Sequence, residues 1–315
     1  MYKSRDMKTT AFQMEDLSLT NRDETHTLAL MQEAGTRDYK IYQFEPKDVS
    51  LIDGDVVARA REVEIDLSSE DFYSYSAPEI INLAEIDVIH IRQDPPFNME
   101  YITSTYFLER IKNQSLIVNN SSKIRDFPEK IYPLEFQEFM PPTLITRDIK
   151  MVEEFKDRYQ DIIIKPLYDF HGNGVIRSAE DDENFDAYLE MTLARESDPI
   201  IVQKYLPEIK QGNKRIIFLD GEVKAALKTV PGSGEFRIYR NSTDHIYELN
   251  DHDKKLCAIL GAEFKKHDLL FVGIDMIGDY LTEINVTSVG SIRRINKLYN
   301  KKFEAEIWDA IEAKL

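Results

Sequence analysis

The sequence predicts an α/β protein in which an open α/β domain is followed by a larger part with antiparallel sheets. Through the first third of the chain, short apolar runs alternate with segments of helical apolar spacing. Further along, segments 214–227 and 272–287 have the pattern of hairpins, with turns at Asp220-Gly221 and Gly278-Asp279. Alternation of strands and helices favours an open sheet, whereas hairpins favour antiparallel pairing.

The length of 315 residues exceeds the usual size of a single core, so two or three lobes are expected. A polar run at 119–123 interrupts the strand and helix pattern. We therefore expect a first domain over 1–122 and a second over 123–315, the latter made of lobes 123–200 and 201–315.

Each expected element follows from its own local pattern. The first domain is expected to have strands at 9–14, 39–44, 88–91 and 116–118, helices at 23–33 and 99–111, and a hairpin over 51–63 that turns at Asp53-Gly54. The second is expected to have helices at 129–139, 148–159, 182–194, 253–267 and 302–315, strands at 162–165, 175–177 and 200–205, and the two hairpins above. Asp148 is the expected N-cap of its helix.

Charge and composition restrict the partners. The net charge is −17 and the pI about 4.9, so the surface repels nucleic-acid backbones and anionic lipid. No run of 18 apolar residues occurs, and the N-terminus leads into no apolar signal segment. The single cysteine, Cys257, rules out a disulfide framework and is expected to be a buried structural residue. These features predict a cytoplasmic protein with no nucleic-acid or membrane partner.

The most informative segment is the hairpin at 272–287, because it places polar residues inside apolar strands. Asp275, Glu283 and Asn285 all carry oxygen ligands of the kind that Mg²⁺ requires. Glu283 and Asn285 are two residues apart and share a face of a strand. A turn with an odd number of residues would pair Asp275 with Glu283 on that face. The sequence thus predicts a metal site on the sheet; an amphipathic hairpin whose acids face water is the alternative.

Three further groups have the residue types of a phosphate-handling site. Lys165 ends a strand and is followed by Gly172 and Gly174, so an amine and backbone N–H groups could meet phosphate oxygens. The strand end at 203–206 could meet a purine edge. Arg215 and Arg237 could stabilise transferring phosphoryl oxygens. Taken singly, each also fits an ordinary strand end or a surface salt bridge.

The order of these groups along the chain resembles the ATP-grasp superfamily. Within it, the chain resembles the bacterial glutathione synthetases, and the stretch Arg-Gln-Asp-Pro-Pro-Phe at 92–97 in the first domain is more diagnostic than the shared nucleotide-binding parts. The resemblance covers nearly the whole chain, through segments 91–98, 106–110, 117–119, 125–126, 129–130, 143–147 and 281–288. It implies a pre-ATP-grasp domain followed by a two-lobed ATP-grasp domain.

The resemblance implies an ATP- and Mg²⁺-dependent ligase, with Mn²⁺ as a substitute cation. Such an enzyme joins γ-glutamylcysteine to glycine through an acyl phosphate, giving glutathione, ADP and phosphate, and it forms a homo-oligomer. Carried over by motif, the roles are ATP phosphates for Lys130, Lys165, Gly172 and Gly174; adenine for Gln203, Lys204, Tyr205 and Leu206; ribose for Asn213; the cation for Asp275, Glu283 and Asn285; phosphoryl transfer for Arg215 and Arg237; and the peptide for Asp94, Ser288 and Arg293.

Several positions depart from the family pattern. The loop at 168–174 carries fewer glycines than usual, the segment after Arg237 lacks its glycine-rich run, Asn213 stands in place of an Asp, and Val289 replaces a proline. Two alternatives therefore stay open at this point. One is another ATP-grasp ligase with a different peptide or amino acid, and the other is a nucleotide-binding relative without turnover.

Overall fold

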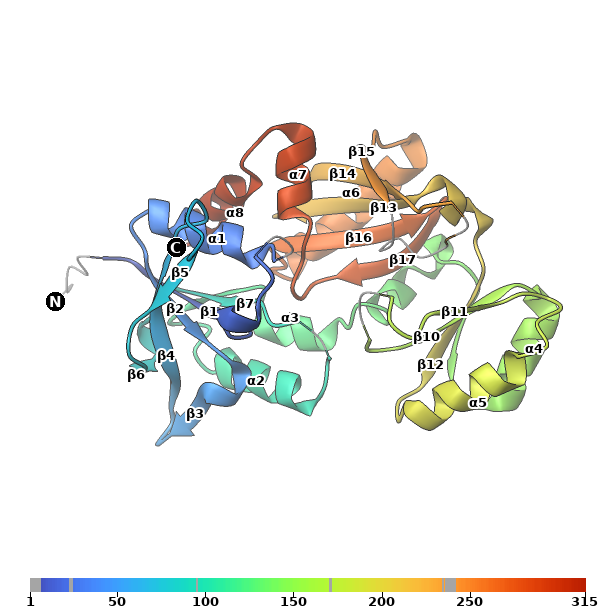
Figure 1. Ribbon diagram of the computed structural model, residues 1–315, viewed down its shortest axis with the longest axis horizontal. Helices are drawn as coiled ribbons and strands as arrows, with labels where there is room; N and C mark the ends of the chain where they lie inside the picture. Colours follow the sequence, from blue (N-terminus) through green and yellow to red (C-terminus); the bar gives the residue numbers. More distant parts are fainter. Residues whose placement is uncertain (1–6, 23–24, 95, 170–171, 234, 236–241) are drawn as a thin grey trace.

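The computed structural model describes residues 7–22, 25–94, 96–169, 172–233, 235 and 242–315. Three β-sheets organise these residues, and the helices pack against them (Figure 1). Among the described residues, no helix combines the length and the apolar character needed to cross a membrane.

The first sheet has eight strands in the order β3-β4-β2-β1-β7-β8, with β5 and β6 paired to β4. Strands β2, β1, β7 and β8 are parallel, and β4 is antiparallel to β2, so the predicted open α/β sheet is confirmed with an antiparallel extension. The elements are β1 Thr9–Gln13, α1 Thr27–Thr36, β2 Lys40–Phe44, β3 Val49–Ile52, β4 Asp55–Ile65, β5 Tyr73–Tyr75, β6 Glu79–Asn82, β7 Val88–Ile91, α2 Met99–Glu109, β8 Leu116–Val118 and α3 Ser121–Asp126.

The second sheet is antiparallel, with four strands in the order β11-β10-β12-β9. Its strands are β9 Thr143–Thr146, β10 Ile162–Pro166, β11 Ile176–Ser178 and β12 Ile200–Lys204, and its helices are α4 Ile149–Tyr159 and α5 Phe185–Arg195. Side chains of both helices share a small apolar cluster with Ile162, Ile164 and Val202 of the sheet. Asp148 caps α4 by accepting from the N–H groups of Lys150 and Met151, as predicted.

The third sheet is also antiparallel, with five strands in the order β15-β14-β13-β16-β17. Its elements are η5 Pro207–Gln211, β13 Asn213–Leu219, β14 Glu222–Val230, β15 Thr243–Ile246, α6 Asp251–Lys266, β16 Phe271–Ile277 and β17 Tyr280–Asn285, followed by α7 Ile292–Tyr299 and α8 Phe303–Glu312. Helix α6 packs its apolar side, including the buried Cys257, on this sheet.

The last helix joins the third sheet to the first domain. The indole N–H of Trp308, which is fully buried on α8, donates to the carbonyl of Leu30 on α1 at 2.9 Å. One continuous apolar cluster contains residues of β1, α1, β13, β14 and α8. The eight-stranded and five-stranded sheets therefore share a core, whereas the four-stranded sheet has its own.

One expected element needs correction, and several elements were not expected. The helix expected at 129–139 is a 3-10 helix, η4 Tyr132–Phe139, with a non-helical residue at Phe136. Pro133 lies in its first turn and has no N–H, which suits the start of a helix but not its interior. The sequence analysis also predicted no counterpart of α3, α7, β5, β6, β9 or β15.

Candidate active site

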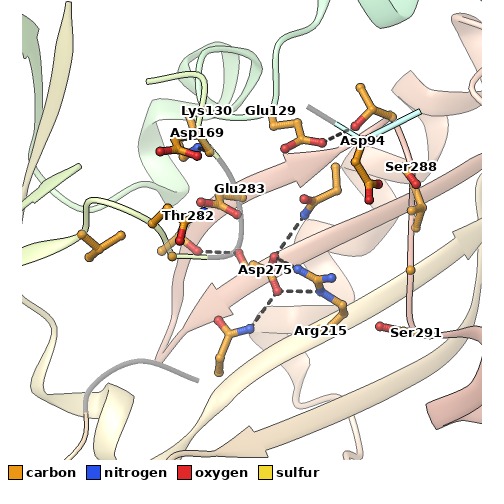
Figure 2. Close-up of a pocket in the computed structure, with 18 of the residues that line it drawn as sticks. Asp94, Glu129, Lys130, Asp169, Arg215, Asp275, Thr282, Glu283, Ser288 and Ser291 are labelled. Atoms are coloured by element: carbon orange, nitrogen blue, oxygen red, sulfur yellow. Dashed lines mark hydrogen bonds and ion pairs between the residues drawn. The ribbon is translucent and has the colours of Figure 1, made fainter. Parts of the chain in front are cut away.

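A cavity of about 810 Å³ lies where the three sheets meet. One wall comes from β10, β12 and the loop after β10, and the other from β13, β16 and β17. The first domain contributes Arg92 and Asp94, which follow β7, and residues of the loop before α1. Figure 2 shows the polar side chains of these elements converging on one space.

Strands β16 and β17 of the second wall form the predicted hairpin, and their face toward the cavity is called the floor below. The hairpin has the predicted register. Asp275 on β16 pairs with Glu283 on β17 and, on its other side, with Arg215 on β13. The turn holds two residues, because Ile277 pairs with Tyr280, so an odd-numbered turn is not the cause. A β-bulge after Asp275 leaves Thr282 as the extra residue and restores the pairing.

The Asp275 carboxylate is surrounded by donors. Its Oδ1 accepts from the side-chain amide of Asn213 at 2.7 Å and from Nε of Arg215 at 2.9 Å, and its Oδ2 accepts from the amide of Asn285 at 3.0 Å and from the second guanidinium nitrogen of Arg215. Burial alone would raise the pKa of Asp275, but the Arg215 charge and these hydrogen bonds lower it overall. The carboxylate is therefore ionised and fixed in place.

The donor set fits a hard cation, with one condition. Asn285 directs its amide nitrogen to Asp275 and to the carbonyl of Gly273, so its oxygen is the atom left for a ligand. Glu283 adds a carboxylate at the cavity wall. Only oxygen atoms are offered, which suits Mg²⁺ or Mn²⁺. The condition concerns Asp275: its lone pairs are already taken by donors, so it can bind a cation only by exchanging one of them.

Two lysines face this floor. Nζ of Lys165 lies 3.6 Å from a carboxylate oxygen of Glu283, and Nζ of Lys130 donates to the backbone carbonyl of Asp169 at 2.5 Å. Burial lowers the pKa of Lys165, and the Glu283 carboxylate opposes that shift. Of the two predicted loop glycines, Gly172 lines the cavity, whereas Gly174 packs beside Pro166.

The end of β12 forms another part of the wall made by the four-stranded sheet. Gln203, Lys204, Tyr205 and Leu206 all line the cavity, although β12 ends at Lys204. The amide of Gln203 donates to the hydroxyl of Thr143 at 3.0 Å. The Arg177 guanidinium lies 3.8 Å from the centre of the Tyr205 ring and is paired with Asp161, which holds this ring in place.

The first domain meets the loop after β17 at the far end of the cavity. Arg92 is buried and donates to the hydroxyl of Thr27 and to the carbonyl of Val289, each at 3.0 Å. Asp94 and Ser288 line the cavity, as predicted for peptide contacts. Of the described residues, Arg294 also lines it, whereas the predicted Arg293 does not. His26 lies beside them, and burial together with the nearby arginines lowers its pKa to about 3. The predicted Arg237 lies outside the described residues.

Among the carboxylates that sequence reasoning missed on the cavity wall, Glu129 makes a defined contact with the loop after β17. Glu129 precedes Lys130, lines the cavity, and accepts from the hydroxyl of Thr287 at 2.6 Å. It lies in an irregular segment before η4, whereas the sequence pattern had predicted a helix from residue 129 onward. The only available signal was its position next to an expected phosphate-binding lysine.

The fold and the cavity together define the class of protein. Among solved structures, the ATP-grasp ligase PsnB bound to a phosphomimetic precursor variant, Mg and ADP superposes with a TM-score of 0.65 at 16% identity, over 98% of both chains. The D-alanyl-alanine synthetase A of Vibrio cholerae superposes with a TM-score of 0.60 at 13% identity, again over 98% of both chains. The chain therefore has an ATP-grasp fold.

The family follows from the sequence comparisons. The models of the prokaryotic glutathione synthetase N-terminal domain and ATP-grasp domain match residues 7–125 and 129–300. The glutathione synthetase of Agrobacterium fabrum is 41% identical over 98% of this chain and 97% of its own length, and that of Vibrio parahaemolyticus is 34% identical over 96% and 97%. The chain belongs to the prokaryotic glutathione synthetase family, whose members are ATP-dependent ligases.

Proposed function

We propose that this chain joins γ-glutamylcysteine to glycine at the expense of ATP, with a divalent cation held by the acidic hairpin. The observation that carries the proposal is the convergence of Lys165, Arg215 and Glu283 on a cavity that also receives Asp94 from the first domain. Cations face the space in which phosphates would lie, and an oxygen donor set stands beside them.

The proposed reaction has two steps. The dipeptide's C-terminal carboxylate takes the terminal phosphoryl group of ATP and becomes an acyl phosphate. The glycine amine then attacks the acyl carbon, and phosphate leaves. Lys130 and Lys165 would hold phosphate oxygens, and Arg215, with Arg237 as its expected partner, would stabilise the charge that develops during transfer. Gln203 to Leu206 would hold adenine, with Asn213 beside the ribose.

Glu283 and Asn285 would hold the cation directly, and Asp275 would join them by giving up a donor. Arg215 is the mobile candidate for that exchange, because its charge is then free to meet phosphoryl oxygens instead of Asp275. When bound, Mg²⁺ or Mn²⁺ neutralises charge on the phosphates and orients them.

Several wider expectations rest on the same proposal. We infer a cytoplasmic homo-oligomer that acts on small molecules, with a first domain over 1–122 and an ATP-grasp domain over 123–315. Asp94, Ser288 and Arg293 are proposed peptide contacts, and the position of Arg294 in the cavity lining adds it as a further candidate.

The test is phosphate release from ATP by the purified chain. We expect release that requires γ-glutamylcysteine, glycine and Mg²⁺ together, with glutathione formed in equal amount. The matched control replaces glycine with alanine or the dipeptide with γ-glutamylalanine. Release with the control pairs but not with the natural pair would contradict the proposed substrates, and absence of any release would contradict turnover.

A further inference from the structure

Glu129 is a carboxylate that the proposed roles above leave unexplained. It lines the cavity on the side that carries Lys130 and Asp94 (Figure 2). A negative charge here would repel ATP and the acyl phosphate, both of which are anions. A carboxylate in this position is therefore useful only if it meets a cation or receives a proton.

The structure holds Glu129 rigidly. Its Oε1 accepts from the hydroxyl of Thr287 at 2.6 Å, and its backbone carbonyl accepts from the N–H of Ile284 on β17 at 3.0 Å. Both contacts fasten it to the strand and loop that carry Glu283 and Ser288. The hydrogen bond described for its side chain uses one oxygen, so the second oxygen is left for a ligand.

Neighbouring groups set the charge state of Glu129. Burial raises the pKa of Glu129, and the hydrogen bond from Thr287 lowers it. The nearby charge of Glu283 on β17 raises it, whereas those of Lys130 and Arg215 lower it. The charge of Glu129 in turn helps to raise the pKa of the buried Tyr101 phenol on α2. The net direction of the Glu129 pKa shift is upward.

Three other acids that line the cavity have charged or amide partners. Asp275 is saturated by Arg215, Asn213 and Asn285, Glu283 faces Lys165, and the Asp169 carboxylate is paired with Arg195. Glu129 differs because a neutral hydroxyl, and not a cation, holds it.

We propose that Glu129 binds the ammonium group of the incoming amino acid and takes the proton that this group must lose before it attacks. The inference rests on the proposed function, because it assumes an acyl phosphate near Lys130 and the acidic hairpin. The attacking nitrogen must come within about 3–3.5 Å of the acyl carbon, so its base belongs at this end of the cavity.

The step balances as follows. One proton of the glycine ammonium passes to the free oxygen of Glu129, leaving an amine with a lone pair. That lone pair forms the C–N bond, and the C–O bond to the phosphoryl group breaks. The second excess proton leaves with the departing group as hydrogen phosphate, and Glu129 returns its proton to solvent.

Hydroxylamine separates this role from all earlier steps. It is uncharged near neutral pH and traps acyl phosphates as hydroxamates without needing a base. In Glu129→Gln, we expect glutathione formation to fall by roughly 10²- to 10³-fold. ATP-dependent γ-glutamylcysteinyl hydroxamate formation should stay within about twofold of wild type. Glu129→Asp, which keeps the carboxylate, should recover part of the glycine rate.

Glu135→Gln is the matched control, since Glu135 is exposed on the same segment and should change neither product. Equal loss of both products in the Gln and Asp variants would overturn the inference, because Glu129 would then serve acyl phosphate formation. A rise in KM for the dipeptide alone would overturn it too, since the γ-glutamyl ammonium would be the partner. Unchanged glutathione formation would also overturn it. A wild-type chain that makes neither glutathione nor hydroxamate would instead overturn the proposed function.

Discussion

Asp275 on the five-stranded sheet accepts hydrogen bonds from three side chains, whereas Lys165 on the four-stranded sheet faces one carboxylate across the cavity at 3.6 Å. The two sheets that carry these residues also differ in how extensively they pack against the rest of the molecule. The five-stranded sheet packs on α6 and shares a core with the first domain, whereas the four-stranded sheet has a small cluster of its own. One wall is fixed by many contacts and the other by few.

The difference indicates a division of labour between the walls. Groups that must be positioned within fractions of an ångström for phosphoryl transfer lie on the wall that many contacts hold. Groups that would bind adenine and phosphates lie on the wall with fewer contacts, which can adjust as a nucleotide enters. Substitutions on the first wall should therefore affect kcat, and those on the second should affect KM for ATP.

The largest effect is expected for Asp275→Asn on the fixed wall. The change weakens a candidate cation ligand and leaves Arg215 without its ionic partner. We expect kcat for glutathione formation to fall by roughly 10²- to 10³-fold. Steady-state kinetics at saturating Mg²⁺ would measure it. Asp279→Asn, at the exposed turn of the same hairpin, should retain the wild-type rate. A large rise in KM for ATP with kcat intact would break the comparison.

Lys165→Met on the other wall should have a smaller and different effect. It removes a charged donor that faces the proposed phosphate site while keeping the length of the side chain. We expect the Kd for ATP to rise by roughly 10- to 100-fold, the loss of one hydrogen bond to a charged group. Equilibrium binding of ATP with Mg²⁺ would measure it, with the exposed Lys150→Met as control. Unchanged ATP affinity would remove Lys165 from the nucleotide site.

Arg177→Ala should have the smallest effect. Arg177 lines no part of the proposed phosphate site, but its guanidinium covers the Tyr205 ring at 3.8 Å. Loss of this support should raise the Kd for ATP by about 2- to 5-fold and leave kcat unchanged. Arg158→Ala is a matched control, because Arg158 lies over the Tyr159 ring on α4. Comparable changes in the two variants would show that ring support is unimportant for nucleotide binding.

The sequence predicts the residue types of the floor well. Acids placed inside apolar strands are costly unless they meet cations or a metal, so Asp275 and Glu283 were visible from the pattern alone. Their register was predicted for the wrong reason. A two-residue turn followed by a bulge at Thr282 gives the same pairing as an odd-numbered turn, and bulge positions depend on tertiary packing.

Groups brought in from distant segments were harder to predict. The hydrogen bond from the Asn213 amide to Asp275 was not predicted, because it depends on the pairing of β13 with β16. Glu129 was missed because it was expected to begin a helix, and its contact with Thr287 joins segments that are far apart in sequence. Such contacts arise from chain segments far apart in sequence, and local patterns carry no information about them.

The docking of Trp308 on α1 has a consequence for motion and for folding. Because the final helix completes an apolar cluster with the first strands, the beginning and end of the polypeptide become stable only together. The eight- and five-stranded sheets should then move as one rigid body, leaving the four-stranded sheet as the hinged part. The amide hydrogens of α1 and β13 should accordingly exchange at similarly slow rates, and those of β10 should exchange faster.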